Sequence, residues 1–239
     1  MHFLVLGKGK TGSLVAEVAA ERGHSVRSLD ITENQNASGL TAATLAGVDA
    51  VIDFTAPESA VANITAVLNA GARIVVGTTG WYSHLDELKA LTHQGGALLY
   101  GTNFSIGVQK LFRLTADLAK LEGYTFSISE THHVTKLDAP SGTAITLREI
   151  IEAAQPGVKV EITSHRIADA KGEHIVTACN DIDTLTVSHD AHSRRGFALG
   201  AVRAAEWVAG KSGVWEFREI FDLCMAPAVR QTPSAGPRQ

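Results

Sequence analysis

The pattern that most restricts the fold lies in the first thirty residues. An apolar run at residues 3–6 leads into a glycine-rich loop, apolar residues at helical spacing follow, and a second strand at residues 25–29 ends at Asp30. The loop residues are Gly7, Lys8, Gly9, Lys10, Thr11 and Gly12. Strand, Gly-x-Gly-x-x-Gly, helix, strand and acidic residue is the arrangement that binds a dinucleotide. The sequence therefore predicts an α/β fold with a Rossmann-type dinucleotide-binding domain.

The end of this loop, Gly9-Lys10-Thr11, also matches the end of a P-loop, the phosphate-binding loop of many nucleotide hydrolases. The P-loop pattern Gly-x-x-x-x-Gly-Lys requires another glycine at position 4. That position holds Leu4, so the P-loop interpretation fails on spacing.

Two small polar loops follow further predicted strands of the first half. Strands are expected at residues 51–54, 73–76 and 97–100, and helices after Pro57 and around Leu88, whereas residues 31–48 show no firm element. Open α/β sheets bind ligands outside the carboxyl ends of their strands. The loops that lie there are Gly77, Thr78 and Thr79 with Gly80, and Gly101, Thr102, Asn103 and Phe104.

The second half has a different organisation. A helix is expected over residues 108–118, a strand over 124–129, and a helix from Gly142, followed by strands at 159–165, 174–179 and 184–189. Because no helical crossover is predicted between the last three of these strands, an α+β domain with a mainly antiparallel open sheet is expected. An open sheet covered on one side favours oligomerisation. A last helix containing Trp207 closes the chain before a tail, residues 227–239, that is expected to be frayed.

Composition excludes several classes of function. Lysine and arginine total 21 against 25 acidic residues, a net charge of −4 without a block of like charge, which argues against nucleic acid or anionic membrane as partner. No apolar run approaches the ~18 residues that a membrane span needs. The N-terminus enters a strand at once, so a cytoplasmic protein is expected, with Cys179 and Cys224 reduced.

The stretch from Glu130 to Ala144 has the chemistry of a site. His132 and His133 can exchange protons near neutral pH, and Lys136 is a mobile positive charge. Ser141 is a suitable N-cap, and the backbone N–H groups of Gly142 and Thr143 behind it are free to hold an anion. The combination indicates a site for a small carboxylated substrate that must receive a proton.

This stretch closely resembles the signature of the 4-hydroxy-tetrahydrodipicolinate reductase family, Glu-x-His-His-x-x-Lys-x-Asp-Ala-Pro-Ser-Gly-Thr-Ala, which it matches without a gap. The loops at residues 77–80 and 101–108 and the run at 193–201 resemble the family as well. Two departures are visible: many members space the glycine loop Gly-x-x-Gly-x-x-Gly, and the region 164–178 is shorter than usual.

The resemblance implies reduction of 4-hydroxy-tetrahydrodipicolinate, with loss of water, by NADH or NADPH in lysine and diaminopimelate biosynthesis. It implies a homotetramer, His132 as proton donor and acceptor, and Lys136 as second acid. His133, Ser141, Gly142 and Thr143 would bind substrate. The dinucleotide would contact residues 7–12, Asp30, residues 77–79 and residues 101–104. By the same resemblance, residues 1–104 form the dinucleotide domain, residues 105–195 the substrate domain, and residues 196–226 return to the first.

Three alternatives are open to test. A related amino-acid dehydrogenase leaves the Lys-x-Asp-Ala-Pro-Ser-Gly-Thr run unexplained, and a non-catalytic NAD-sensing module leaves the histidines and lysine idle. A metal site made of His132, His133 and either His165 or His174 is disfavoured, because adjacent histidines on a strand point to opposite faces. No metal is therefore expected.

Overall fold

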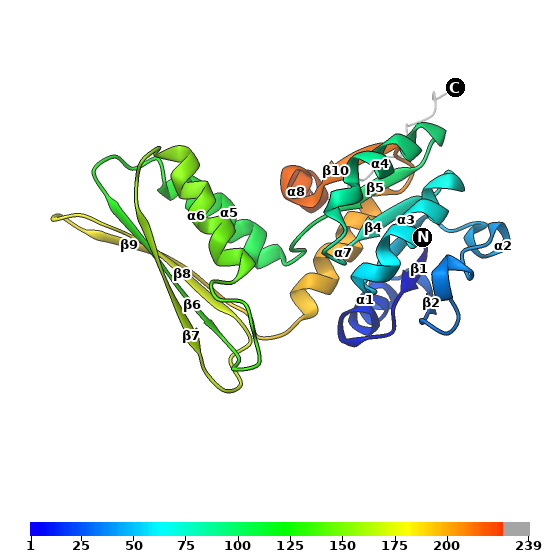
Figure 1. Cartoon of the computed structure of the whole chain (residues 1–239), viewed down its shortest axis with the longest axis horizontal. Helices are drawn as coiled ribbons and strands as arrows, with labels where there is room; N and C mark the ends of the chain where they lie inside the picture. The colour runs from blue at the N-terminus through cyan, green and yellow to red at the C-terminus, as the bar shows by residue number, and fades with distance from the viewer. Residues whose placement is uncertain (227–239) are drawn as a thin grey trace, which may run out of the picture.

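The structure is a computed structural model that describes residues 1–226. The tail for which fraying is predicted, residues 227–239, lies outside the described residues. Figure 1 shows two bodies side by side, one built on a six-stranded sheet and the other on a four-stranded sheet. The predicted α/β class, with a parallel Rossmann-like sheet and a second sheet, is confirmed.

The six-stranded sheet has the order β10-β5-β4-β3-β1-β2, and all its pairings are parallel. Its strands are β1 (His2–Leu6), β2 (Ser25–Leu29), β3 (Ala50–Asp53), β4 (Arg73–Val76), β5 (Ala97–Tyr100) and β10 (Gly213–Glu216). Alternate residues of β1 enter separate cores, Phe3 and Val5 on one face and Leu4 and Leu6 on the other. Burial on both faces explains why these strands read as continuous apolar runs.

Helices cover both faces of this sheet. One core packs α1 (Lys10–Glu21), α7 (Arg195–Val208) and α8 (Phe217–Met225) against it. The other packs α2 (Ala42–Leu45), α3 (Pro57–Asn69) and α4 (Leu85–Ala90) against it. Short 3₁₀ turns lie at Gln35–Ala37, Tyr82–His84 and Leu91–Gln94. The prediction of no element over residues 31–48 is wrong for α2, which has four residues and is too short to show a helical period.

The four-stranded sheet has the order β7-β6-β8-β9. Its strands are β6 (Thr125–His132), β7 (Val160–Arg166), β8 (Glu173–Cys179) and β9 (Thr184–Asp190). Helices α5 (Ile106–Leu118) and α6 (Gly142–Ala154) cover one face, and the opposite face carries hydroxyl side chains such as Ser127 and Thr177. Two pairings are antiparallel as predicted, but β6 and β7 are parallel, because α6 is a helical crossover between them.

The chain passes between the two bodies after β5 and again after β9. On its return, α7 packs on α1, and β10 pairs with β5 at the sheet edge. The helix containing Trp207 was expected to be the last element, but β10 and α8 follow it. The domain boundaries at residues 104 and 195 stay a prediction. Over residues 1–226, no helix combines the length and apolar character needed to cross a membrane.

Candidate active site

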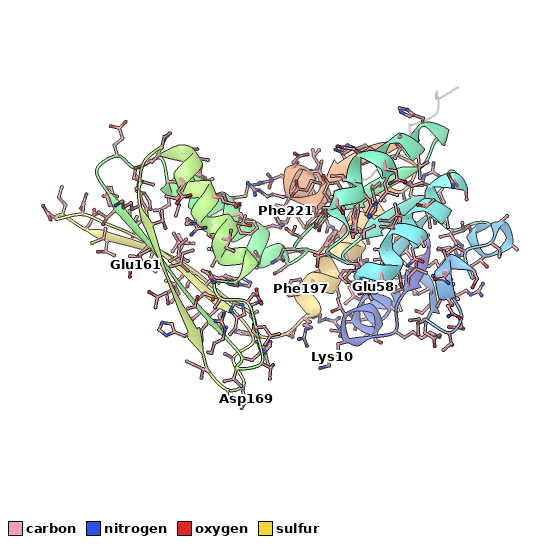
Figure 2. All side chains as sticks on the ribbon, in the orientation of Figure 1. Lys10, Glu58, Glu161, Asp169, Phe197 and Phe221 are labelled. Atoms are coloured by element: carbon pink, nitrogen blue, oxygen red, sulfur yellow. The ribbon has the colours of Figure 1, made fainter. Side chains whose placement is uncertain are left out.

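A cleft of about 1470 Å³ lies between the two bodies and is lined by both. A smaller pocket of about 480 Å³ adjoins it, since Lys10, Thr79 and Arg194 line the two together. Figure 2 shows Lys10 and Phe197 on the side of the six-stranded body that faces the other sheet, and Asp169 on the loop after β7. The predicted site residues that line the larger cleft are Lys10, Thr79, Thr102, Asn103, His132, His133, Lys136, Ser141, Gly142 and Thr143.

The smaller pocket lies at the glycine loop, and its lining includes Gly9, Thr11, Gly77 and Thr78. Gly9 is the N-cap of α1, and a Cβ built on it would meet no atom within 4 Å. Gly12 is closely packed instead, because a Cβ there would lie 1.9 Å from the carbonyl oxygen of Gly7. Gly12 thus lets α1 approach β1, and Gly9 leaves the helix N-terminus open to an anion.

Replacing these two glycines by alanine should separate the two roles. Gly12→Ala should lower the free energy of unfolding by about 1–3 kcal/mol, because the new Cβ overlaps backbone. Gly9→Ala should lower it by less than about 1 kcal/mol, as an N-cap change, while weakening dinucleotide binding. Urea unfolding and titration with the dinucleotide measure both effects. Equal losses of stability in the two variants would contradict these roles.

Asp30 lies at the end of β2 in a cluster of charges. Its Oδ1 accepts hydrogen bonds from the backbone N–H groups of Thr32 and Glu33 and from the Thr32 hydroxyl, and that hydroxyl is the main cause of the lowered pKa of Asp30. Lys8 donates to Glu33 at 2.6 Å, and its Nζ is 3.7 Å from Asp30 Oδ2. Neither pocket is lined by Asp30, Lys8, Gly7, Gly12, Gly101 or Phe104.

Buried contacts hold the two small polar loops. The Thr78 hydroxyl donates to Asp53 at 2.9 Å, and Asp53 is fully buried and also accepts from Asn63. Asn103 donates from Nδ2 to the Thr143 hydroxyl at 3.3 Å, which joins the loop after β5 to the start of α6. The Phe104 side chain, however, stacks on Phe217 in the core, with ring centroids 4.5 Å apart.

The signature stretch places both adjacent histidines at the cleft. Strand β6 ends at His132, and His133 lies beyond it; His132 is buried and His133 is partly exposed. Ser141 is the N-cap of α6, with its hydroxyl accepting from Ala144 N, and a Cβ on Gly142 would meet no atom within 4 Å. Lys136 binds both carboxylate oxygens of Asp138 at 2.8 Å.

Behind His132 lies a buried polar cluster that the sequence did not predict. Nδ1 of His132 is 2.5 Å from Oε2 of Glu130, and Oε1 of Glu130 contacts Arg166 at 3.1 Å and the backbone N–H of Ser141 at 3.3 Å. His174 contacts the Ser141 hydroxyl at 3.0 Å through Nε2. Glu130, His132 and His174 have donor atoms within 4.8 Å of one another, whereas His133 and His165 are not part of this group. The guanidinium of Arg166 already balances the Glu130 charge.

Arg194 is the most prominent cleft residue without a predicted role, since it lines both pockets. It stands with Phe197 at the start of the returning segment, in the 193–201 run. Asp169 and Lys171, from the loop between β7 and β8, line the opposite wall. The sequence shows that Arg194 lies next to the start of a predicted helix. It does not show which other elements would line the cleft together with Arg194.

Comparison with known proteins assigns both parts of the chain to one family. The family model described as "Dihydrodipicolinate reductase, N-terminus" matches residues 1–104, and "Dihydrodipicolinate reductase, C-terminus" matches residues 107–221. Among solved structures, a dipicolinate-bound dihydrodipicolinate reductase from Paenisporosarcina sp. TG-14 superposes with a TM-score of 0.79 at 22% identity, covering 92% of this chain and 99% of that one. At that identity the likeness shows the fold.

Two curated relatives carry the name 4-hydroxy-tetrahydrodipicolinate reductase. The protein from Christiangramia forsetii is 34% identical over 239 residues, covering 92% of this chain and 98% of that protein. The protein from Natronomonas pharaonis is 34% identical over 241 residues, covering 90% and 97%. The chain therefore belongs to the 4-hydroxy-tetrahydrodipicolinate reductase family, and it is an NAD(P)H-dependent oxidoreductase of lysine and diaminopimelate biosynthesis.

Proposed function

We propose that the cleft binds 4-hydroxy-tetrahydrodipicolinate and that His132 supplies the proton for its reduction, with loss of water, to tetrahydrodipicolinate. One observation carries the proposal: a single cleft brings His132 and Lys136 together with Lys10, Thr79 and Asn103 of the predicted cofactor loops. A proton donor beside a cofactor site and an anion site is what this reaction requires.

The residues present fit a dinucleotide. The open space at Gly9, the N-terminus of α1 and the side chains of Lys10 and Thr11 suit a pyrophosphate at the smaller pocket. Residues 77–79 and Asn103 continue the wall toward the larger cleft, which is the side for the nicotinamide. A reduced nicotinamide supplies the hydride when it is bound. The buried side chain of Phe104 leaves only its backbone for such a contact.

The substrate half of the cleft matches a cyclic dicarboxylate. The N–H groups of Gly142 and Thr143, at the start of α6, would hold one carboxylate. Lys136 would hold the other and act as second acid, and His133 would contact the ring. In the free protein the ammonium group of Lys136 binds Asp138. To hold a substrate carboxylate, Lys136 would leave Asp138 and bind the substrate instead.

A steady-state assay with freshly generated substrate tests the proposal. Oxidation of NADH or NADPH that depends on 4-hydroxy-tetrahydrodipicolinate is the expected result. A non-catalytic dinucleotide-binding module would bind NADH without turnover, and a related amino-acid dehydrogenase would oxidise an amino acid instead. Absence of substrate-dependent turnover in a folded protein that binds NADH would contradict the proposed function.

NADH should be preferred over NADPH. Asp30 accepts a ribose hydroxyl well but repels a 2′-phosphate, and the three residues that follow it, 31–33, include no arginine. Lys8 and Lys10 could partly offset that repulsion. Lys8, however, is bound to Glu33, and the cluster of Lys8, Asp30 and Glu33 keeps a net negative charge. The specificity constant kcat/KM should therefore be larger for NADH than for NADPH. Asp30→Ala should bring the two specificity constants closer together. A larger kcat/KM of the unaltered protein for NADPH would overturn this prediction.

The open face of the four-stranded sheet supports a homo-oligomer, and the family resemblance favours a tetramer. That face presents Ser127, Thr177 and Thr186, which lie beside one another across three strands. Light scattering coupled to size exclusion would give the number of subunits. A cytoplasmic location is part of the same proposal.

A further inference from the structure

Glu130 is fully buried, although it carries a carboxylate and stands only two positions before His132 on β6. Residues two apart on a strand share a face. We infer that Glu130 is a positioning residue for proton transfer: it accepts the Nδ1 proton of His132 and leaves Nε2 to act in the cleft, while Arg166 and Ser141 hold Glu130 from its other oxygen. The inference rests on the proposed role of His132 as proton donor.

The two oxygens of Glu130 have separate partners. Oε1 is occupied by the guanidinium of Arg166 at 3.1 Å and the N–H of Ser141 at 3.3 Å. Oε2 has His132 Nδ1 at 2.5 Å, an ion-pair contact, and neither of these two buried atoms has a hydrogen bond of standard geometry. Because neither atom has another partner, a proton on Nδ1 shared with Oε2 would satisfy both atoms, which favours the Nδ1–H tautomer of a neutral ring.

The strand pairing explains why these groups meet. Ser164, Glu130, His174 and His189 form one register row across the sheet, from β7 to β9. Arg166 pairs with His132 in a neighbouring row. The parallel β6–β7 pairing therefore brings a guanidinium to a carboxylate 36 residues away in sequence.

The opposite nitrogen of His132, Nε2, lies beside Gly172. A Cβ built on Gly172 would lie 3.3 Å from Nε2, and Gly172 has φ of +138°, a conformation that favours glycine. The preceding residues of that loop, 168–171, line the cleft. Nε2 thus faces the loop that borders the cleft, and Gly172 keeps a side chain away from it.

The charges around His132 come from several elements. Glu130 is the nearby anion; Lys136, Arg166 and, when protonated, His174 oppose a positive His132. Burial is the largest influence and lowers the pKa of His132, Glu130 raises it, and Lys136 lowers it. His174, whose ring centroid is 5.0 Å away, has its pKa lowered to about 4 by burial and by His132, and so it is neutral at working pH.

Glu130 itself stays ionised. Burial raises its pKa, but the neighbouring polar groups of Ser164, Ser141 and Arg166 outweigh that influence and lower the pKa to about 2. The negative charge next to Nδ1 therefore persists over the whole working range and favours the imidazolium form of His132.

Glu130→Gln tests the inference, because glutamine keeps an acceptor for Arg166 and Ser141 but removes the charge. The pKa of His132 should fall, and the neutral ring should no longer be held as the Nδ1–H tautomer. Imidazole ¹⁵N spectra recorded against pH measure both in the free protein. The kcat should fall about ten- to a hundred-fold at neutral pH. Its decline with rising pH should begin at a lower pH than in the unaltered protein. Glu130→Asp keeps the negative charge, so the pKa of His132 should fall less in this variant than in Glu130→Gln.

Glu161→Gln is the matched control, since Glu161 is exposed on β7 and faces away from this cluster. The melting temperature should fall in Glu130→Gln, because Arg166 loses its charged partner. Binding of pyridine-2,6-dicarboxylate should change little, which separates positioning from loss of fold. An unchanged His132 pKa and tautomer in this variant would overturn the inference. If the variant fails to fold, the same spectra of the unaltered protein test the inference. An Nε2–H tautomer of its neutral His132 would contradict it. The spectra do not depend on turnover. If the protein had no reductase activity, the proposed function would be contradicted, but the inference about Glu130 could still be tested.

Discussion

His132→Gln lowers kcat by about 10²–10⁴-fold and leaves dinucleotide affinity nearly unchanged, because a positioned general acid contributes that much to rate. Glutamine occupies a similar volume but cannot give up a proton at working pH. His132 ends β6 at the substrate side of the cleft, and the glycine loop of the smaller pocket does not include it. Steady-state kinetics and fluorescence titration with NADH measure the two effects.

The pH dependence provides a second measure of the same variant. His132 acts as an acid only when protonated, and burial lowers its pKa despite Glu130. The kcat of the unaltered enzyme should therefore fall as pH rises through this lowered pKa, and His132→Gln should lose that limb of the profile. His165→Gln, an exposed histidine on the other face of the sheet, is the control. Unaltered kcat in His132→Gln would remove His132 from the mechanism.

Much of the first body follows from the sequence because local patterns determine it. Strands β2, β4 and β5 have the predicted bounds: β4 and β5 are largely apolar runs that end before a glycine, and β2 ends before Asp30. The Ser141 cap was likewise predictable, because capping depends on residues within one turn. Strand β10 was missed: the run Gly-Val-Trp-Glu is four residues long, and only pairing with β5 makes it a strand.

The candidate site was predictable in its residue types but not in its contacts. The signature located His132 and Lys136, and the cleft contains both. The ion pair between Glu130 and Arg166 depends on the parallel β6–β7 pairing, which the sequence analysis did not predict. The Asn103–Thr143 contact likewise joins residues that are 40 positions apart in the sequence. Contacts across sheets and between bodies are set by topology, and no local period encodes them.

Pyridine-2,6-dicarboxylate should inhibit competitively against the substrate, as a flat mimic of the same dianion. The cleft offers two separate anion sites, the open N-terminus of α6 at Gly142 and the ammonium group of Lys136. Pyridine-2-carboxylate, which lacks one carboxylate, should bind about 1.5–3 kcal/mol more weakly through loss of one charge-assisted contact. Inhibition constants for the two compounds measure this difference.

Lys136→Ala should reduce the difference in binding free energy between the two inhibitors, because the variant has lost one of the two anion sites. Since Asp138 holds Lys136 through two contacts of 2.8 Å, part of the binding free energy is spent on separating that pair. Asp138→Asn should therefore tighten the dicarboxylate more than the monocarboxylate. Lys159→Ala, an exposed lysine next to β7, is the control and should leave both constants unchanged. If the difference persists undiminished in Lys136→Ala, Lys136 holds no substrate carboxylate, and only its role as second acid is left.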